Sequence, residues 1–250
     1  MKEPEVIGEG TYGCVTKPSL VCKGSKRNYS HKVSKIMIKK YAKKEHNDMK
    51  QITKIDGIDK YIVSLPDLCV PKLDTTFIRT LRKCGNEKIK AALEGDFRLL
   101  VIEDGGISLK QFTEEVIQTL SKHDICVFLT KTYNLLEALC FFYEHDIVHH
   151  DIKMRNIVYN IETTKIKFID FGLMKKRSKL VRESTKNKND MAQKWANFPP
   201  EYDVANKYHY DKSDYQMKYK DFIERLSYTF DAYGLGIMMK SLIEYIMRYN

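Results

Sequence analysis

Residues 149–156 of this chain are His149-His150-Asp151-Ile152-Lys153-Met154-Arg155-Asn156. This stretch holds a carboxylate, an ammonium group and a carboxamide at Asp151, Lys153 and Asn156, directly after the apolar pair Ile147-Val148. A loop with these groups can orient a hydroxyl, neutralise a phosphate and bind a hard cation. The simpler alternative is a polar loop that ends a helix, and the apolar flanks make it the weaker interpretation.

A second acidic motif, Asp170-Phe171-Gly172, follows the apolar stretch 166–169. A carboxylate at the end of a strand, with a glycine close behind it, is well placed to bind Mg²⁺. An Asp-x-Gly tripeptide is usually only a turn, so the indication comes from its position after Asp151. The stretches 157–159 and 166–169 predict a small hairpin between the two motifs.

The N-terminus carries the pattern G-x-G-x-x-G-x-V over residues 8–15, and residues 6–15 predict a strand, a turn and a strand. Glycines let backbone N–H groups approach phosphate oxygens closely. An ordinary glycine-rich hairpin is an equally good interpretation of this motif alone. A dinucleotide-binding turn is disfavoured because a strand, not a helix, follows the last glycine.

A lysine on the next strand is the candidate partner of that loop. Segment 31–38 alternates as a strand does, and segment 40–55 is an amphipathic helix. Lys35 could hold two phosphates if a carboxylate kept it in place. We expect Glu45 to be that carboxylate, because Met49 lies one helical turn later and would face the same core. In a chain this rich in lysine, a surface pairing is the alternative.

The remaining patterns predict an α+β protein with segregated parts. The front is strand-rich with one helix, and the apolar run 99–102 predicts a buried strand that ends at a turn, 103–106. We therefore place a boundary between residues 1–104 and 105–250. Behind it we expect helices over 110–146, a polar, basic loop over 174–190, and one or two helices over 219–249.

Composition excludes several classes of protein. The 250 residues carry 43 Lys+Arg against 33 Asp+Glu, a net charge of +10, with 43% hydrophobic residues, which is typical of a globular domain. The charge fits an anionic partner, although a solvated basic surface is the simpler explanation. No apolar run approaches the roughly 20 residues of a membrane helix. Residues 1–5 have no apolar segment of a secretory signal, so we expect a cytoplasmic location.

The six cysteines are scattered without a C-x-x-C pair. We interpret them as reduced thiols in a cytosol-like compartment, in preference to a disulfide framework. A zinc site built from Cys14, Cys22, Cys69 and Cys84 is disfavoured by their spacing.

Taken together, the motifs resemble the protein kinase family in type and order over roughly residues 6–240. Lys153, two residues after Asp151, resembles Ser/Thr rather than tyrosine kinases. The glycine-rich loop and the strand Val33-Ser34-Lys35 also look like protein kinases of large DNA viruses, for which the location would be the host cytoplasm or the virion. The resemblance implies a bilobal fold, with a small β-rich N-terminal lobe (1–104) and a helical C-terminal lobe (105–250) that lacks the family's last helices.

The resemblance also implies ATP and Mg²⁺ as cofactors, a protein substrate and a role for each motif. Asp151 would accept or orient the substrate hydroxyl, Lys153 would meet the γ-phosphate, and Asn156 and Asp170 would carry Mg²⁺. Lys35, oriented by Glu45, would hold the α- and β-phosphates. The residues expected to contact ATP directly are Ile7, Gly8, Glu9, Gly10, Thr11, Tyr12, Gly13, Cys14, Val15, Val33, Lys35, Glu103, Gly105 and Val158.

Departures from the family pattern carry predictions of their own. His150 stands where many kinases have the arginine that docks a phosphorylated activation loop, so we expect activity without that phosphorylation. Lys194 stands where Ser/Thr members usually have threonine. Asp231 would brace the catalytic loop by accepting backbone N–H bonds, at the start of a helix. The net +5 of residues 173–190 suggests acidic or already phosphorylated substrates, with a solvated loop as the alternative.

Three other functions stay open at this point. A pseudokinase scaffold is disfavoured because Lys35, Asp151, Asn156 and Asp170 are all present. A small-molecule phosphotransferase is disfavoured by Lys153, which that class usually lacks. A nucleic-acid-binding module is unlikely, since no basic motif with interleaved aromatic residues accompanies the charge.

Overall fold

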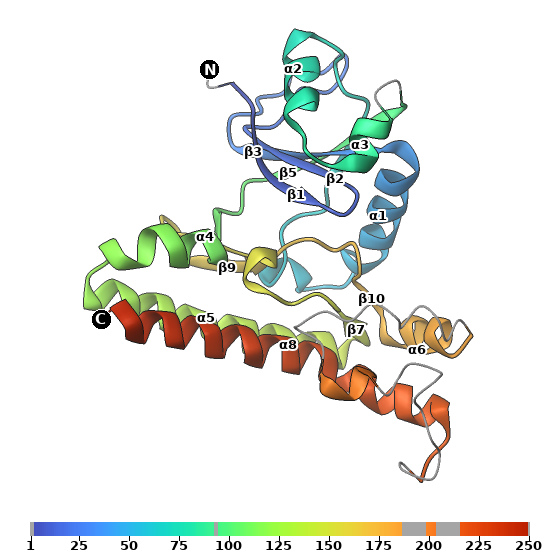
Figure 1. Cartoon of the computed structure of the whole chain (residues 1–250), viewed down its shortest axis with the longest axis vertical. Coiled ribbons are helices and arrows are strands. Elements are labelled where there is room, and N and C mark those ends of the chain that lie inside the picture. The colour runs from blue at the N-terminus through green and yellow to red at the C-terminus, as the bar shows by residue number, and fades with distance from the viewer. Residues whose placement is uncertain (1–2, 93–94, 187–198, 204–215, 250) are drawn as a thin grey trace. The chain divides into compact units, whose positions relative to one another are not determined.

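The structure, a computed structural model, describes residues 3–92, 95–186, 199–203 and 216–249 (Figure 1). The chain forms two compact units, one of residues 1–59 and 63–104 and the other of residues 60–62 and 105–250. The first holds β1 (Glu5–Gly10), β2 (Gly13–Lys17), β3 (Lys32–Ile38), α1 (Lys39–Ile52), β4 (Asp67–Cys69), α2 (Thr75–Lys83), α3 (Glu87–Ala91) and β5 (Phe97–Glu103). The second holds β6 (Ile107–Ser108), α4 (Leu109–Gln111), α5 (Lys122–Glu144), β7 (Ile147–Val148), β8 (Ile157–Asn160), β9 (Lys165–Phe168), β10 (Lys175–Lys176), α6 (Arg177–Lys186) and α8 (Tyr219–Tyr249).

An antiparallel sheet in the order β1-β2-β3-β5-β4 forms the first unit. The predicted hairpin of residues 6–15 is confirmed as β1 and β2, and the predicted strands over 31–38 and 99–102 are confirmed as β3 and β5. Leu99, Leu100 and Val101 are at most 3% exposed, so the apolar run is buried on both faces. The sheet thus fixes the register of the lysine strand between the glycine-rich hairpin and β5.

Three helices accompany this sheet, where the sequence predicted one. The predicted helix is confirmed as α1, which buries Ala42, Met49 and Ile52 and ends at Ile52. The other two helices, α2 and α3, were missed although both carry a side-chain N-cap: the Phe77 N–H donates to the Asp74 carboxylate at 3.0 Å, and the Ile89 N–H to the Asn86 amide oxygen at 3.1 Å. Such caps satisfy donors that a short helix leaves open.

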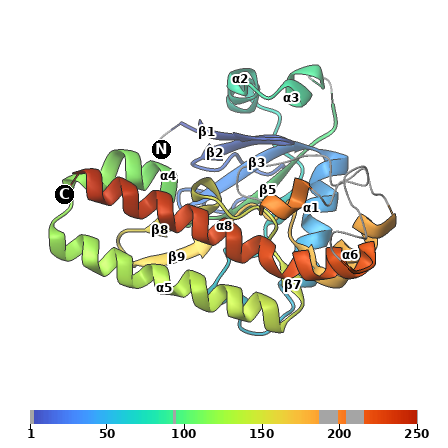
Figure 2. The same ribbon diagram turned by 60° about the horizontal axis from the view of Figure 1, so that its bottom comes forward.

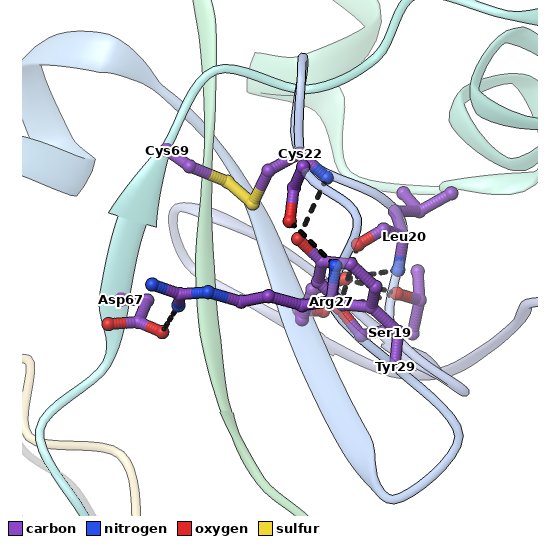
Figure 3. Close-up of a disulfide and its surroundings, with 10 residues drawn as sticks. Ser19, Leu20, Cys22, Arg27, Tyr29, Asp67 and Cys69 are labelled. Carbon is purple, nitrogen blue, oxygen red and sulfur yellow. Dashed lines mark hydrogen bonds and ion pairs between the residues drawn. A yellow bond between two sulfur atoms is a disulfide. The ribbon is translucent and has the colours of Figure 1, made fainter.

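The interpretation of the cysteines as reduced thiols is wrong for four of the six. Cys14 pairs with Cys84 and Cys22 with Cys69, with Cα–Cα distances of 6.0 and 5.8 Å. Figure 3 shows the second disulfide beside Tyr29, whose hydroxyl accepts from the Cys22 N–H at 3.3 Å. The partners are 70 and 47 residues apart, so local spacing could not reveal them. These are the four cysteines of the disfavoured zinc alternative; Cys126 and Cys140 keep exposed free thiols.

Long helices dominate the second unit. Helices α5 and α8 lie side by side in both views (Figure 1, Figure 2), and α5 also covers the sheet β6-β8-β9. The helix predicted within residues 110–146 is confirmed as α5, where Phe128, Leu135 and Phe142 are at most 1% exposed. The predicted hairpin is confirmed as β8 and β9, paired from Ile157–Phe168 to Asn160–Lys165.

One of these helices meets a length and composition test for crossing a membrane. The most apolar window of α5 has a mean hydropathy of 1.4, and a third of that window is buried inside the protein. The core helix of a soluble protein passes the same test, and α5 packs its apolar face on β9. It also carries Glu137, which pairs with Lys60 at 3.2 Å. We interpret α5 as a core helix.

The basic segment 174–190 is not a loop in its described part, and this prediction is wrong. Lys175 and Lys176 form β10 on the strand β7, and residues 177–186 form α6. The helix buries Arg177, Leu180, Val181 and Ser184, a spacing of three, four and seven that marks one helical face. That face packs against Phe222, Ile223 and Leu226 of α8. The run of lysines hid an amphipathic pattern.

Candidate active site

The loop between β7 and β8 orients the Asp151 carboxylate. Lys153 Nζ donates to both carboxylate oxygens at 2.8 and 2.7 Å, and Asn156 Nδ2 donates to one of them at 2.7 Å. Asn156 Nδ2 also reaches the Asp151 backbone carbonyl at 2.9 Å, which closes the loop on itself. Asp151 is 9% and Asn156 5% exposed, so the carboxylate is held in a mostly buried position.

A half-buried aspartate on α8, Asp231, holds the start of this loop. The His149 and His150 N–H groups donate to the two oxygens of Asp231 at 2.7 and 2.8 Å, as predicted. Burial raises the pKa of the Asp231 carboxyl, against the opposing effect of these donors and of the nearby charges of His149 and Arg177. Asp231 lies inside the unbroken helix α8, however, so its predicted place at a helix start is wrong.

His150 is locked beside this brace in a neutral form. Its φ of 65° is in the left-handed region, which lets its N–H and that of His149 converge on one carboxylate. Burial, reinforced by the charges of Lys175 and His149, lowers the pKa of its imidazole to about 3. The ring packs edge-on against Phe230, with centroids 4.6 Å apart. His150 is therefore uncharged at physiological pH.

The second acidic motif lies next to Asn156. The Ile169 N–H donates to the Asn156 carbonyl at 2.9 Å, and Asp170 follows with a left-handed φ of 59°, which aspartate tolerates better than most residues. An amide oxygen and a carboxylate are ligands that suit Mg²⁺, which keeps several waters and substrate phosphates of its own. The described residues hold no group of three or more His, Cys, Asp or Glu arranged for a metal. By the chemistry of their oxygen donors, Asn156 and Asp170 suit Mg²⁺, and they stay its predicted ligands.

In the first unit, Lys35 and Glu45 form the expected ion pair. Lys35 Nζ on β3 lies 2.9 Å from both oxygens of Glu45 on α1, and the two side chains are only 16% and 10% exposed. Lys32 on the same strand pairs instead with Glu103 at 2.5 Å. The register of β3 and β5 places Lys32 directly opposite Glu103. Of the two, Lys35 is the lysine held by a mostly buried carboxylate.

The glycine-rich hairpin combines open and crowded positions. A Cβ at Gly13 would lie 2.0 Å from the Ile36 carbonyl, so only glycine lets β2 approach β3 there. The Cys14 side chain turns into the core and forms a disulfide, so a nucleotide could meet only its backbone. Ile7 is 55% exposed at a bulge in β1. Val33 is 9% exposed in this unit, and Val158 is 6% exposed in the other.

The sequence profile of the protein kinase domain matches residues 1–216. The chain belongs to the protein kinase family. This kinase has the α+β architecture with an N-terminal antiparallel sheet that the family implies. Membership implies protein phosphotransferase activity, and the family generally uses ATP and Mg²⁺.

Some sequence predictions about this kinase fall outside the described residues or stay untested. Lys194 lies outside them. The backbone contacts of Glu103 and Gly105 with adenine stay a prediction. The contacts made to the glycine-rich hairpin by residues 84–88 were missed, because they depend on a disulfide and on two unpredicted helices.

Proposed function

We propose that this kinase transfers the γ-phosphate of ATP to serine or threonine hydroxyls of proteins. The observation that carries the proposal is the oriented Asp151 carboxylate, held by Lys153 and Asn156 in a loop that Asp231 braces. Phosphoryl transfer depends mainly on positioning and charge stabilisation. Asp151 would accept the hydroxyl proton, and Lys153 would stabilise charge on the transferred phosphoryl group.

The other site residues divide the binding of the nucleotide. Lys35, kept in place by Glu45, would hold the α- and β-phosphates, as its short and mostly buried ion pair supports. Asn156 and Asp170 would hold Mg²⁺, which neutralises charge on the phosphates when bound. The presence of all four groups favours an active enzyme over a pseudokinase scaffold.

We propose that substrates are acidic or already phosphorylated. The exposed side of α6 presents Arg182 and Lys186, while Lys175 is engaged by Glu183 at 3.1 Å and Arg177 is buried. The substrate preference therefore rests on fewer cations than the sequence suggested. Replacing Arg182 and Lys186 together by glutamate should raise the KM for acidic peptides. The rate on neutral peptides should not change.

We also propose that activity does not require a phosphorylated activation segment. A neutral imidazole at His150 offers no charge to a phosphate, unlike arginine. Phosphatase treatment of the purified kinase should leave its rate unchanged. Loss of activity after that treatment, with recovery on rephosphorylation, would contradict the proposal.

The decisive experiment compares Asp151→Asn with the wild type, using labelled ATP, Mg²⁺ and an acidic protein substrate. We expect a fall in rate of about 10²–10⁴-fold, the usual contribution of a positioned base, with ATP binding retained. Asp221→Asn, at an exposed position of α8, is the matched control and should behave as the wild type. Equal transfer by wild type and Asp151→Asn would show that the role given to Asp151 is wrong.

A further inference from the structure

A short segment between α2 and α3 grips the glycine-rich hairpin at successive points. The Asn86 amide Nδ2 donates to the Gly10 carbonyl at 2.6 Å, and the Gly85 N–H donates to Glu9 Oε1 at 2.6 Å. The Cys14–Cys84 disulfide ties the end of the turn to the same segment. Segment 84–88 thus contacts the end of β1 at Glu9 and Gly10 and the start of β2 at Cys14.

Aromatic contacts complete this grip at the tip of the turn. Lys88 Nζ lies 4.2 Å above the ring of Tyr12, and that ring packs against Tyr41 of α1 with centroids 4.7 Å apart. A cation above an aromatic face is attracted by the ring's negative quadrupole. Each contact joins parts of the first unit that are far apart in sequence.

The glycine at 85 is itself part of the arrangement. A Cβ at this position would lie 2.7 Å from both oxygens of the Glu9 carboxylate. A side chain here would push the carboxylate away from the N–H group that it accepts from. The absence of a side chain at residue 85 is therefore required for this contact.

We infer that segment 84–88 is a positioning element of the glycine-rich hairpin, with Asn86 as its main positioning residue. Glycines lose more conformational freedom than other residues when they become ordered, and a Cβ at Gly8 would meet nothing within 4 Å. Without the contacts of segment 84–88, the glycines of the hairpin would lose this freedom when the nucleotide binds. Contacts that order it beforehand reduce that cost and raise affinity.

The inference rests on the proposed function, because it assigns the hairpin to ATP, but its structural part can be tested without any substrate. Asn86→Asp keeps an oxygen to cap α3 and loses the donor to Gly10. Gly85→Ala displaces the Glu9 carboxylate. We expect amide hydrogen exchange over residues 8–14 to rise about fivefold in either variant, the effect of one lost hydrogen bond, with β3 and β5 unchanged.

The kinetic arm separates positioning from a general loss of structure. In Asn86→Asp the KM for ATP should rise about fivefold while kcat stays within about twofold. Asp74→Ala is the matched control, because the described side-chain contacts of Asp74 are the cap of α2 at the Phe77 N–H and the ion pair with Lys72, not the hairpin. An equal rise of the KM for ATP in Asp74→Ala would overturn the inference. Unchanged hydrogen exchange over residues 8–14 in both Asn86→Asp and Gly85→Ala would overturn it as well.

A second pair of variants tests the covalent contact. Replacing Cys14 and Cys84 together by serine removes the disulfide at the hairpin, and replacing Cys22 and Cys69 removes the other one from the same unit. We expect only the first pair to raise exchange over residues 8–14 and the KM for ATP. Equal effects of the two pairs would contradict a specific grip. A wild type that binds no ATP would refute the proposed function, while the exchange data would still decide whether segment 84–88 orders the hairpin.

Discussion

Removal of the Asp231 carboxylate tests how the catalytic loop is supported. Asp231→Ala leaves the N–H groups of His149 and His150 without the acceptor that they reach at 2.7 and 2.8 Å. A hydrogen bond to a charged group contributes about 1.5–3 kcal/mol, so two contribute about 3–6 kcal/mol. The charge is costly to bury, as its raised pKa indicates, and this offsets part of the loss. We expect a net destabilisation of about 2–4 kcal/mol.

The assay is urea unfolding followed by far-UV circular dichroism, together with hydrogen exchange at the His149 and His150 amides. Asp231→Asn keeps one acceptor and removes the buried charge, so it should lose less stability than Asp231→Ala. Asp221→Ala, exposed in the first turn of the same helix, should cost only about 0.3–1 kcal/mol, the contribution of a carboxylate near a helix N-terminus. Hydrogen exchange at the His149 and His150 amides should rise in both Asp231 variants and should stay unchanged in Asp221→Ala.

The refuting result is specific. If Asp231→Ala unfolded at the same urea concentration as Asp221→Ala and left exchange at His149 and His150 unchanged, the carboxylate would not support the loop. If stability fell but phosphoryl transfer kept its rate, the brace would be structural and of no consequence for the orientation of Asp151.

Three further predictions follow from the described contacts. The pKa of His150 is about 3 in the folded protein and 6.5 in the unfolded chain, so the unfolded chain takes up a proton first as pH falls. Below pH 6.5 the free energy of unfolding of the wild type should therefore fall by up to about 1.4 kcal/mol per pH unit relative to His150→Asn. An equal difference between the urea midpoints of the two proteins at pH 7 and at pH 5 would contradict this. Glu45→Gln should raise the KM for ATP about tenfold by loosening Lys35, measured in a kinase assay; an unchanged KM would show that Lys35 needs no partner. Unfolded protein should react with two equivalents of a thiol reagent before reduction and six afterwards; six at the outset would exclude the disulfides.

Local sequence patterns were sufficient to predict those helices and strands whose own residues determine their structure. The hairpin of residues 6–15 follows from its glycine-rich middle between apolar ends, β3 from its alternation, and helix α5 from apolar residues at helical spacing. Glu45 could be predicted as the partner of Lys35 because Met49, one helical turn later, faces the core, which places Glu45 on the same face of the helix. The role of Asp231 in holding the loop was predicted from the family resemblance and not from the local sequence pattern. The resemblance did not predict that Asp231 lies inside α8 and not at its start.

Contacts between distant segments account for the errors. Nothing near Cys14 or Cys22 in sequence indicates a partner 70 or 47 residues away. The sequence predicted a loop in place of α6 because the many charges obscured the helical spacing of Arg177, Leu180 and Val181. The apolar face of α6 packs on α8, a contact that the local sequence does not show. The cytoplasmic location and the viral origin stay predictions, and the disulfides remove the thiol argument that supported the first.

The two disulfides are nested, since the loop closed by Cys22 and Cys69 lies wholly within the one closed by Cys14 and Cys84. Four cysteines allow three pairings, and loop-closure entropy alone favours bonds between neighbours in sequence, which would join Cys14 to Cys22 and Cys69 to Cys84. The native pairing therefore forms directly only when the strands assemble before the sulfur atoms react. Earlier oxidation would favour scrambled pairs, which the molecule would then have to correct by thiol–disulfide exchange before it matures.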